Sequence, residues 1–254
     1  MLMYLAAAAP KPENPYGLME ALEQGGTIAW TVFIILCAMS VGTFYILFTK
    51  LIEQQKVISQ GKKIRATFWR AASLKEASAK LEKNSAYKQI VDDGIKAQEE
   101  HGKLKDPVEA HDWLHGSLAR SEAAINSSLG GGLAFLATVG STSPFIGLFG
   151  TVIGIYRALI KIGAAGQASI DAVAGPVGEA LIMTALGLLV AVPAVLAYNY
   201  LQARNKRIAE MLTGFSTDVL ANIASGGAVK PAVATTAAGA KPAPAKPAAA
   251  PTKS

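Results

Sequence analysis

The sequence places one acidic residue, Glu179, inside a long apolar segment. Glu179 follows Gly178, and residues 180–203 contain no Asp, Glu, Lys or Arg. A charged side chain at the centre of a membrane helix costs about 2.5–3.5 kcal/mol on insertion scales, so such groups usually face a bundle interior, an aqueous path or a partner. A low dielectric disfavours the ionised carboxylate, and we therefore expect Glu179 to exchange protons near neutral pH. The alternative is a structural carboxylate near a helix end, since Asp171 is close in sequence.

Hydroxyl side chains accompany this carboxylate in the apolar segments. Thr151 and Thr184 are the best candidates for relaying hydrogen bonds toward Glu179. The other hydroxyls are Thr138, Ser141, Thr142 and Ser143. Hydroxyls of this kind also bond to carbonyls of their own helix, which is the commoner outcome.

Small residues and prolines recur in the same segments. Gly147, Gly150 and Gly154 lie three or four residues apart, a spacing that predicts a helix face open to close backbone approach. That face predicts a compact and oligomeric helix assembly, although packing within one subunit would use it as well. Three prolines are expected to bend their helices or free backbone carbonyls: Pro144, Pro176 and Pro193.

Three windows without charge predict the elements that position these residues. The chain has 254 residues, of which 51% are hydrophobic and only 17% charged, whereas a typical soluble domain is about 25% charged. A bilayer core requires about 20 apolar residues of helix. We therefore predict an all-α integral membrane protein with transmembrane helices at 27–49, 129–160 and 173–201, and not a soluble enzyme.

The remaining segments read as extramembrane. Residues 1–26 form an outer tail with a possible amphipathic helix at 17–24, and 161–172 form a short loop. Residues 50–128 form a helical domain, in which 108–129 is expected to be one helix that runs straight into the second apolar window. The third helix continues through 202–224. The second and third helices thus extend well beyond the bilayer, and the Ala/Pro/Lys-rich residues 225–254 are expected to be disordered.

Basic residues predict the orientation in the membrane. The segment 50–128 carries 14 Lys and Arg, whereas residues 1–26 carry only Lys11 and the 161–172 loop only Lys161. Because cytoplasmic loops are enriched in Lys and Arg, we expect a multi-pass protein of the bacterial inner membrane. Its N-terminus would be periplasmic and its C-terminus cytoplasmic.

Other functions find little support in the sequence. The net charge of +6 comes from basic residues that follow the apolar windows, so nucleic acid is not an expected partner. His111 and His115 share a helical spacing, but a third metal ligand is not evident, and solvated helix residues are the better interpretation. There is no GxxxxGK[ST] phosphate loop. We predict no cofactor, no metal and no catalytic residues.

Two ordered stretches resemble a known family. Residues 144–155 read PFIGLFGTVIGI, and residues 178–199 begin GEAL and end AYN, with Thr184, Gly187 and Pro193 between. Both stretches resemble the second- and third-span signatures of the MotA/TolQ/ExbB proton-channel family. The resemblance covers roughly residues 27–224 and leaves the two tails outside.

This resemblance implies an assembly and a function. ExbB-like members form homopentamers around a central pore that holds a dimer of single-span ExbD subunits, and proton flow energises TonB for uptake of siderophores and vitamin B12. By residue match, Glu179 would be the pore carboxylate, with Thr151 and Thr184 as pore threonines. Membrane lipids would surround the assembly, and Arg157 is a possible charge partner of a ring of Glu179 carboxylates.

Two alternatives remain open from the sequence. The first is a TolQ-like subunit, which would belong to a similar proton-driven complex that maintains outer-membrane integrity in the Tol-Pal system. A non-conducting membrane scaffold would hold its partners together and use Glu179 only structurally.

Overall fold

A computed structural model describes residues 17–105, 108–165 and 170–231, and in these residues it is entirely helical. The tails at 1–16 and 232–254 lie outside the described residues, as do residues 106–107 and 166–169. The helices are α1 (Leu18–Thr67), η1 (Phe68–Arg70), α2 (Leu74–Ala79), α3 (Ala86–His101), α4 (Ala110–Gly130), α5 (Leu133–Ala165) and α6 (Ile170–Ala224).

The chain divides into two compact units. Unit 1 takes its described residues from 1–58 and 119–213, and unit 2 takes them from 59–118 and 214–254. The division falls within α1, within α4 and just beyond residue 213 of α6, so these three helices contribute residues to both units.

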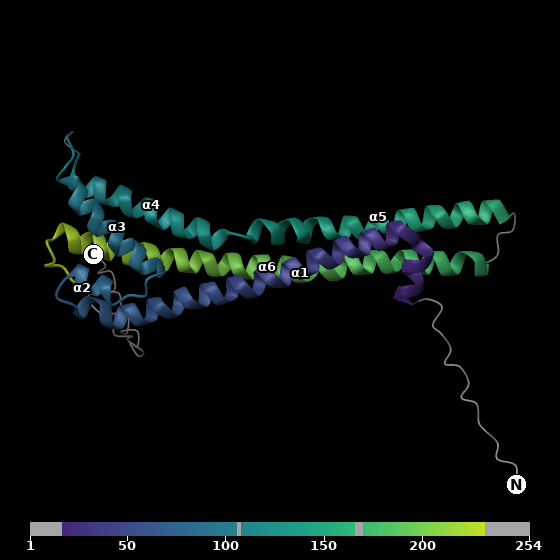
Figure 1. The fold of residues 1–254 in the computed structure, drawn as a ribbon, viewed down its shortest axis with the longest axis horizontal. Coiled ribbons are helices and arrows are strands. Elements are labelled where there is room, and N and C mark those ends of the chain that lie inside the picture. Colours follow the sequence, from purple (N-terminus) through teal and green to yellow (C-terminus); the bar gives the residue numbers. More distant parts are fainter. Residues whose placement is uncertain (1–16, 106–107, 166–169, 232–254) are drawn as a thin grey trace, which may run out of the picture. The chain divides into compact units, whose positions relative to one another are not determined.

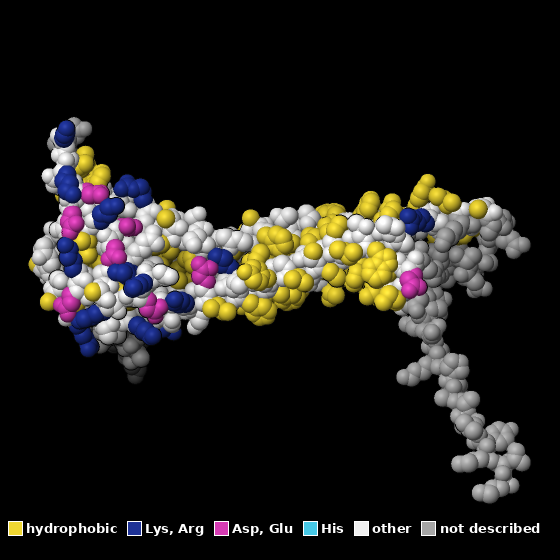
Figure 2. Space-filling model, in the orientation of Figure 1, with side chains coloured by type: hydrophobic (Ala, Val, Ile, Leu, Met, Phe, Trp, Pro, Cys, Tyr) yellow, Lys and Arg dark blue, Asp and Glu magenta, His cyan; other side chains and the backbone are white. Residues whose placement is uncertain are grey.

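Three helical stretches of the described chain are long and apolar enough to cross a membrane. They are Gly25–Arg70, Ala110–Ala164 and Ala180–Ala224. In unit 1 many large apolar side chains on α1, α5 and α6 are exposed, as Figure 2 shows for one face; examples are Val41, Phe48, Phe145, Leu189 and Leu196. Apolar surface of this extent requires lipid or another protein to cover it.

The core of unit 1 is formed by α1, α5 and α6, which run beside one another (Figure 1). Leu36 of α1, Val139 of α5 and Met183 of α6 belong to one buried cluster. A second cluster joins Leu136 of α5 to Leu201 of α6. These buried residues hold α5 and α6 in the register that positions Thr151 and Thr184.

Two glycine turns interrupt the long helices. Gly26 has φ 60° and ψ −153°, which breaks α1 between its first turns and its long apolar part. Gly132 has φ 84° and separates α4 from α5. The helix expected at 108–129 is α4, but the expectation that it runs straight into the second apolar window was wrong. A left-handed backbone at Gly132, which glycine adopts without steric cost, follows the end of α4 at Gly130.

Polar side chains satisfy the end of α4. The Lys50 ammonium donates to the Ser128 carbonyl at 2.9 Å, and the Asn205 amide donates to the Leu129 carbonyl at 3.1 Å. The Gln54 amide donates to Asn205 Oδ1 at 2.7 Å and to the Leu201 carbonyl at 3.0 Å. The last carbonyls of a helix lack intrahelical partners, so these side chains fix the point at which α5 starts.

Unit 2 is a small helical domain with its own core. One face of α3 is buried, and its members recur at helical spacing: Tyr87, Ile90, Val91, Gly94 and Ala97. A Cβ at Gly94 would lie 3.2–3.4 Å from side chains of Leu118, Val219 and Ile223, so helices pack closely there. Figure 2 shows Lys, Arg, Asp and Glu side chains gathered on this unit.

Candidate functional site

The candidate site lies where α5 and α6 pack against each other in unit 1. Gly140 faces Val195, Gly147 faces Gly187, and Gly154 faces Ala180. Residue numbers rise along α5 as they fall along α6, so the two helices are antiparallel. The three glycines named in the sequence analysis all lie on this contact.

Backbone meets backbone at Gly147 and Gly187. A Cβ at Gly147 would lie 2.5 Å from the Met183 carbonyl oxygen and 3.0 Å from the Gly187 Cα. A Cβ at Gly187 would lie 2.6 Å from the Ser143 carbonyl oxygen. Separations below 3.0 Å leave no room for a methyl group, so both positions require glycine. Gly150 is less crowded, with 3.0 Å to Met183 Cβ.

The two candidate relay threonines meet across this contact. The Thr184 hydroxyl donates to the Thr151 hydroxyl oxygen at 3.5 Å, the long limit for a hydrogen bond. Thr151 in turn donates to the Leu148 carbonyl at 2.6 Å and is only 5% exposed. The arrangement is a short chain of hydroxyls from α6 to the α5 backbone, one turn from the glycine contact.

Ser143 is a further polar residue in this interface. Its side chain is 0% exposed, and its hydroxyl has no hydrogen-bond partner in the described residues. By contrast, Thr138, Ser141 and Thr142 donate to carbonyls of their own helix at 2.7–3.0 Å, the outcome that the sequence analysis names as the commoner one. Ser143 therefore carries an unsatisfied donor in a place where water is scarce.

Arg157 sits one turn beyond Gly154 on α5. Its guanidinium donates to the Gly25 carbonyl at 2.5 Å, at the break in α1. A Cβ at Gly26 would lie 3.3 Å from the same nitrogen. Arg157 thus ties the start of the long part of α1 to α5, a contact that the sequence did not indicate.

The remaining predicted site residues are placed by their helices. Glu179 belongs to α6 and directly precedes Ala180, which packs on Gly154; its side chain lies outside the described part of the structure. Whether it pairs with Arg157 thus stays a prediction. Pro176 also belongs to α6 with an undescribed side chain, and α5 and α6 continue as helices through Pro144 and Pro193.

Sequence reasoning missed several contributors. Gly187 entered only as part of a family signature, although it makes the closest contact with Gly147. Gln54 and Asn205 were not singled out, since polar residues beyond an apolar window look solvated in a sequence. The useful signal for Gly187 was its spacing of three from Thr184 and seven from Ala180, which puts all three on one helix face.

Comparison with known proteins identifies relatives over most of the chain. The model of the "MotA/TolQ/ExbB proton channel family" matches residues 82–213. The biopolymer transport protein ExbB of Xanthomonas campestris pv. campestris is 38% identical over 213 residues, covering 80% of this chain and 84% of the relative. ExbB of Neisseria meningitidis is 35% identical over 208 residues, covering 80% and 94%.

A relative with a different role also matches. The Tol-Pal system protein TolQ of Pseudomonas aeruginosa is 33% identical over 214 residues, covering 81% of this chain and 90% of the relative. The family match spans the α5–α6 contact with its facing glycines and threonines. Together with three helices long and apolar enough to cross a membrane, these matches show that the chain belongs to the MotA/TolQ/ExbB proton channel family.

Proposed function

We propose that this chain is the proton-conducting subunit of an inner-membrane motor that energises TonB. In this proposal the motor drives uptake of siderophores and vitamin B12 across the outer membrane. Its partners would be an ExbD-like single-span subunit, TonB and further copies of the chain, arranged as a pentamer around the ExbD-like helices. Relatives named ExbB, at 35–38% identity over 80% of the chain, support this assignment.

The observation that carries the proposal is the hydroxyl pair of Thr151 and Thr184. The pair lies at a glycine-lined helix contact, and Glu179 precedes Thr184 by five residues on α6, about 7.5 Å of helix rise. A carboxyl group and two hydroxyls within a few turns of each other supply donors and acceptors for proton transfer. In lipid such groups are costly unless they serve a path or a partner.

The first test is siderophore-dependent iron uptake in cells that lack their own copies of both the TonB-energising and the Tol systems. The cells would express this chain with an ExbD-like partner and TonB. We expect Glu179→Gln to abolish uptake at unchanged membrane levels. Glu210→Gln, the same change at an exposed position of α6, is the matched control and should leave uptake intact. Full uptake by the Glu179→Gln variant would instead favour the scaffold role.

The hydroxyl pair can be tested separately. Thr184→Val keeps the shape of the side chain and removes the donor to Thr151, whereas Thr184→Ser keeps the hydroxyl. We expect uptake to fall strongly in the first variant and to be largely kept in the second, with equal yields of assembled protein. Equal uptake by both variants would remove the relay role from Thr184.

A TolQ-like role is the second candidate, because a TolQ relative is 33% identical over 81% of the chain. The same cells can be given Tol partners in place of the ExbD-like subunit and TonB. Detergent resistance restored with the Tol partners, together with no iron uptake in the cells given the ExbD-like subunit and TonB, would assign the chain to envelope integrity.

A further inference from the structure

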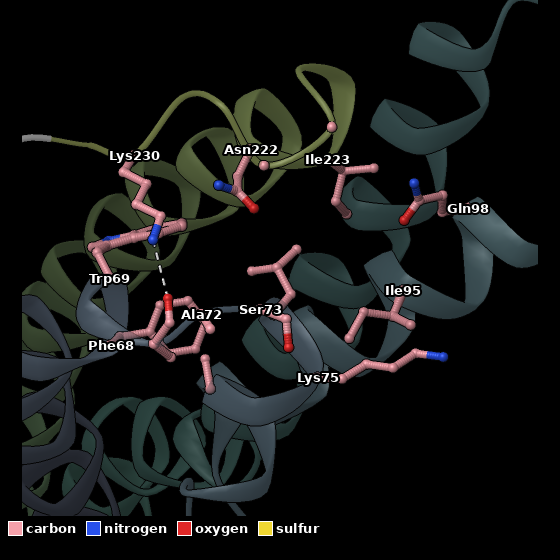
Figure 3. A pocket seen from close by; sticks show the side chains of 15 residues that line it. Phe68, Trp69, Ala72, Ser73, Lys75, Ile95, Gln98, Asn222, Ile223 and Lys230 are labelled. Carbon is pink, nitrogen blue, oxygen red and sulfur yellow. Dashed lines mark hydrogen bonds between the residues drawn. The ribbon is translucent and has the colours of Figure 1, made fainter.

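A cavity of about 320 Å³ lies within unit 2 (Figure 3). Phe68 and Trp69 of η1 and Leu74 of α2 form one wall. Ile95 of α3 and Ile223 of α6 form another. The volume is at the lower end of the range of small-molecule sites, which are mostly apolar with a few placed polar groups.

The segment after α6 is folded into a strap that completes this cavity. Gly226 and Gly227 have φ 64° and 90°, and the Gly227 amide donates to the Asn222 carbonyl at 2.8 Å, which ends α6 in a left-handed turn. The Asn222 amide then donates to the Val229 carbonyl at 2.7 Å, and the Val229 amide donates to the Ser225 hydroxyl at 2.9 Å. The cavity wall is thus held by specific bonds.

Lys230 closes the strap over the cavity. Its ammonium donates to the Ala71 carbonyl at 3.1 Å, the dashed line in Figure 3. An ammonium has three N–H donors, and no carboxylate of the described residues forms an ion pair with this one. At the Ser73 side of the cavity, the Glu76 amide donates to the Ser73 hydroxyl at 3.2 Å, which caps the start of α2.

The charged side chains that line the cavity are of one sign. Within the described residues, the only charged side chains that line it are Lys75 and Lys230. Lys75 is engaged: it donates to Glu99 at 2.7 Å, and this hydrogen bond together with its positive charge holds the pKa of Glu99 below its ordinary value. Lys230 therefore supplies the cationic group that is not matched by a carboxylate.

We propose that this cavity binds a small organic anion with a flat apolar body, such as an aryl phosphate or carboxylate. The apolar body would lie among Trp69, Leu74 and Ile223, and the anionic group would bind the Lys230 ammonium. A neighbouring hollow around Lys88 and Asp92 differs, because those two charges already pair at 3.0 Å. The tail of residues 232–254 also carries lysines. It is disfavoured as the occupant because both charged side chains that line the cavity are lysines.

The test uses the full chain in nanodiscs of phosphatidylcholine, so that no anionic lipid competes. The three tryptophans, Trp30, Trp69 and Trp113, are replaced by 5-fluorotryptophan and followed by ¹⁹F NMR, with Trp69→Phe for assignment. The probe is 1-naphthyl phosphate, and 1-naphthol is its neutral counterpart. We expect the phosphate to shift the Trp69 signal saturably, with the Trp113 signal unchanged as a report on folding.

Three variants define the site. Lys230→Met should weaken binding about tenfold, the value of a charge-assisted hydrogen bond. Lys75→Met should weaken it much less. Ala72→Phe, at an exposed position on the cavity wall, should block it. Adding anionic phosphatidylglycerol to the discs should not compete if the ligand is a free anion, and competition would assign the site to a lipid headgroup.

Two results would overturn the proposal. Equal binding of naphthol and naphthyl phosphate, or an unchanged affinity in Lys230→Met, would show that the site does not recognise an anionic group. Binding that appears only after deletion of residues 232–254, together with a Trp69 shift on that deletion, would show that the chain's own tail fills the cavity.

Discussion

At the residue scale, Ser143 shows how a single hydroxyl can oppose stability. Its oxygen is buried between α5 and α6 without a hydrogen-bond partner in the described residues. An unpaired buried donor costs about 1–3 kcal/mol. We expect Ser143→Ala to raise the free energy of unfolding, by about 1 kcal/mol, since part of the gain is lost to the small void that the substitution leaves.

The measurement is an SDS titration of the purified protein in mixed micelles, followed by circular dichroism. Ser141→Ala is the matched control, because the Ser141 hydroxyl is exposed and donates to the Thr138 carbonyl. A loss of stability in Ser143→Ala would mean that Ser143 has a partner in the assembled protein, such as an ordered water or a side chain of another subunit.

At the element scale, the α5–α6 contact depends on the absence of side chains. A methyl group at Gly147 would collide with the Met183 carbonyl oxygen at 2.5 Å. We expect Gly147→Ala to lower the free energy of unfolding by about 1–3 kcal/mol, the usual range for overpacking. The titration described for Ser143 measures it.

Gly163 provides the matched control within the same helix. Nothing lies within 4 Å of a Cβ there, and alanine is favoured over glycine in a helix by up to about 1 kcal/mol. Gly163→Ala should therefore be neutral or stabilising. Equal stability of both variants would show that α5 and α6 can separate at Gly147 without cost.

The apolar windows and the glycine face were predictable because both depend on spacing along the chain. Apolar stretches this long without a charged residue are found only in membranes or in large protein cores. Gly147, Gly150 and Gly154 recur at helical spacing, which places them on one helix face. The end of α4 was not predictable in this way. Gly132 turns the chain, whereas Gly147 packs inside a helix, and a sequence shows the same residue type for both.

The contacts between residues of different helices could not be predicted from the sequence either. Pairing Thr151 with Thr184 requires the register of two antiparallel helices, which packing around Val139 and Met183 decides. The sequence also did not indicate that Arg157 donates to the Gly25 carbonyl. A broken helix exposes such carbonyls, and the break at Gly26 was not evident from the sequence.

The turn between α4 and α5 gives its own prediction. Gly132 has φ 84°, and a Cβ there would lie 2.9 Å from Ile46 Cγ2. A left-handed conformation costs an L-residue about 1–2 kcal/mol. We expect Gly132→Ala to destabilise the protein by at least that amount in the same titration, whereas Gly130→Ala, with nothing within 4 Å, should not. Unchanged stability in Gly132→Ala would mean that α4 and α5 can join as one helix.

At the scale of the whole molecule, the exposed apolar surface of unit 1 requires lipid or another protein to cover it. Cys37, the one cysteine in the sequence, tests this requirement directly. It is exposed on α1 in the isolated chain, so only lipid or another subunit would shield it. We expect a membrane-impermeant maleimide to leave Cys37 unlabelled in intact spheroplasts and in inverted vesicles, and to label it fully in SDS.

Two single-cysteine variants in a Cys37→Ala background extend the test to orientation. Glu23 lies before the first apolar window and Lys62 after it, and both are exposed. Because basic residues favour the cytoplasmic side, Glu23→Cys should react in spheroplasts and Lys62→Cys only in inverted vesicles. The reverse pattern would invert the proposed topology. Labelling of Cys37 from one side in membranes would mean that α1 borders water.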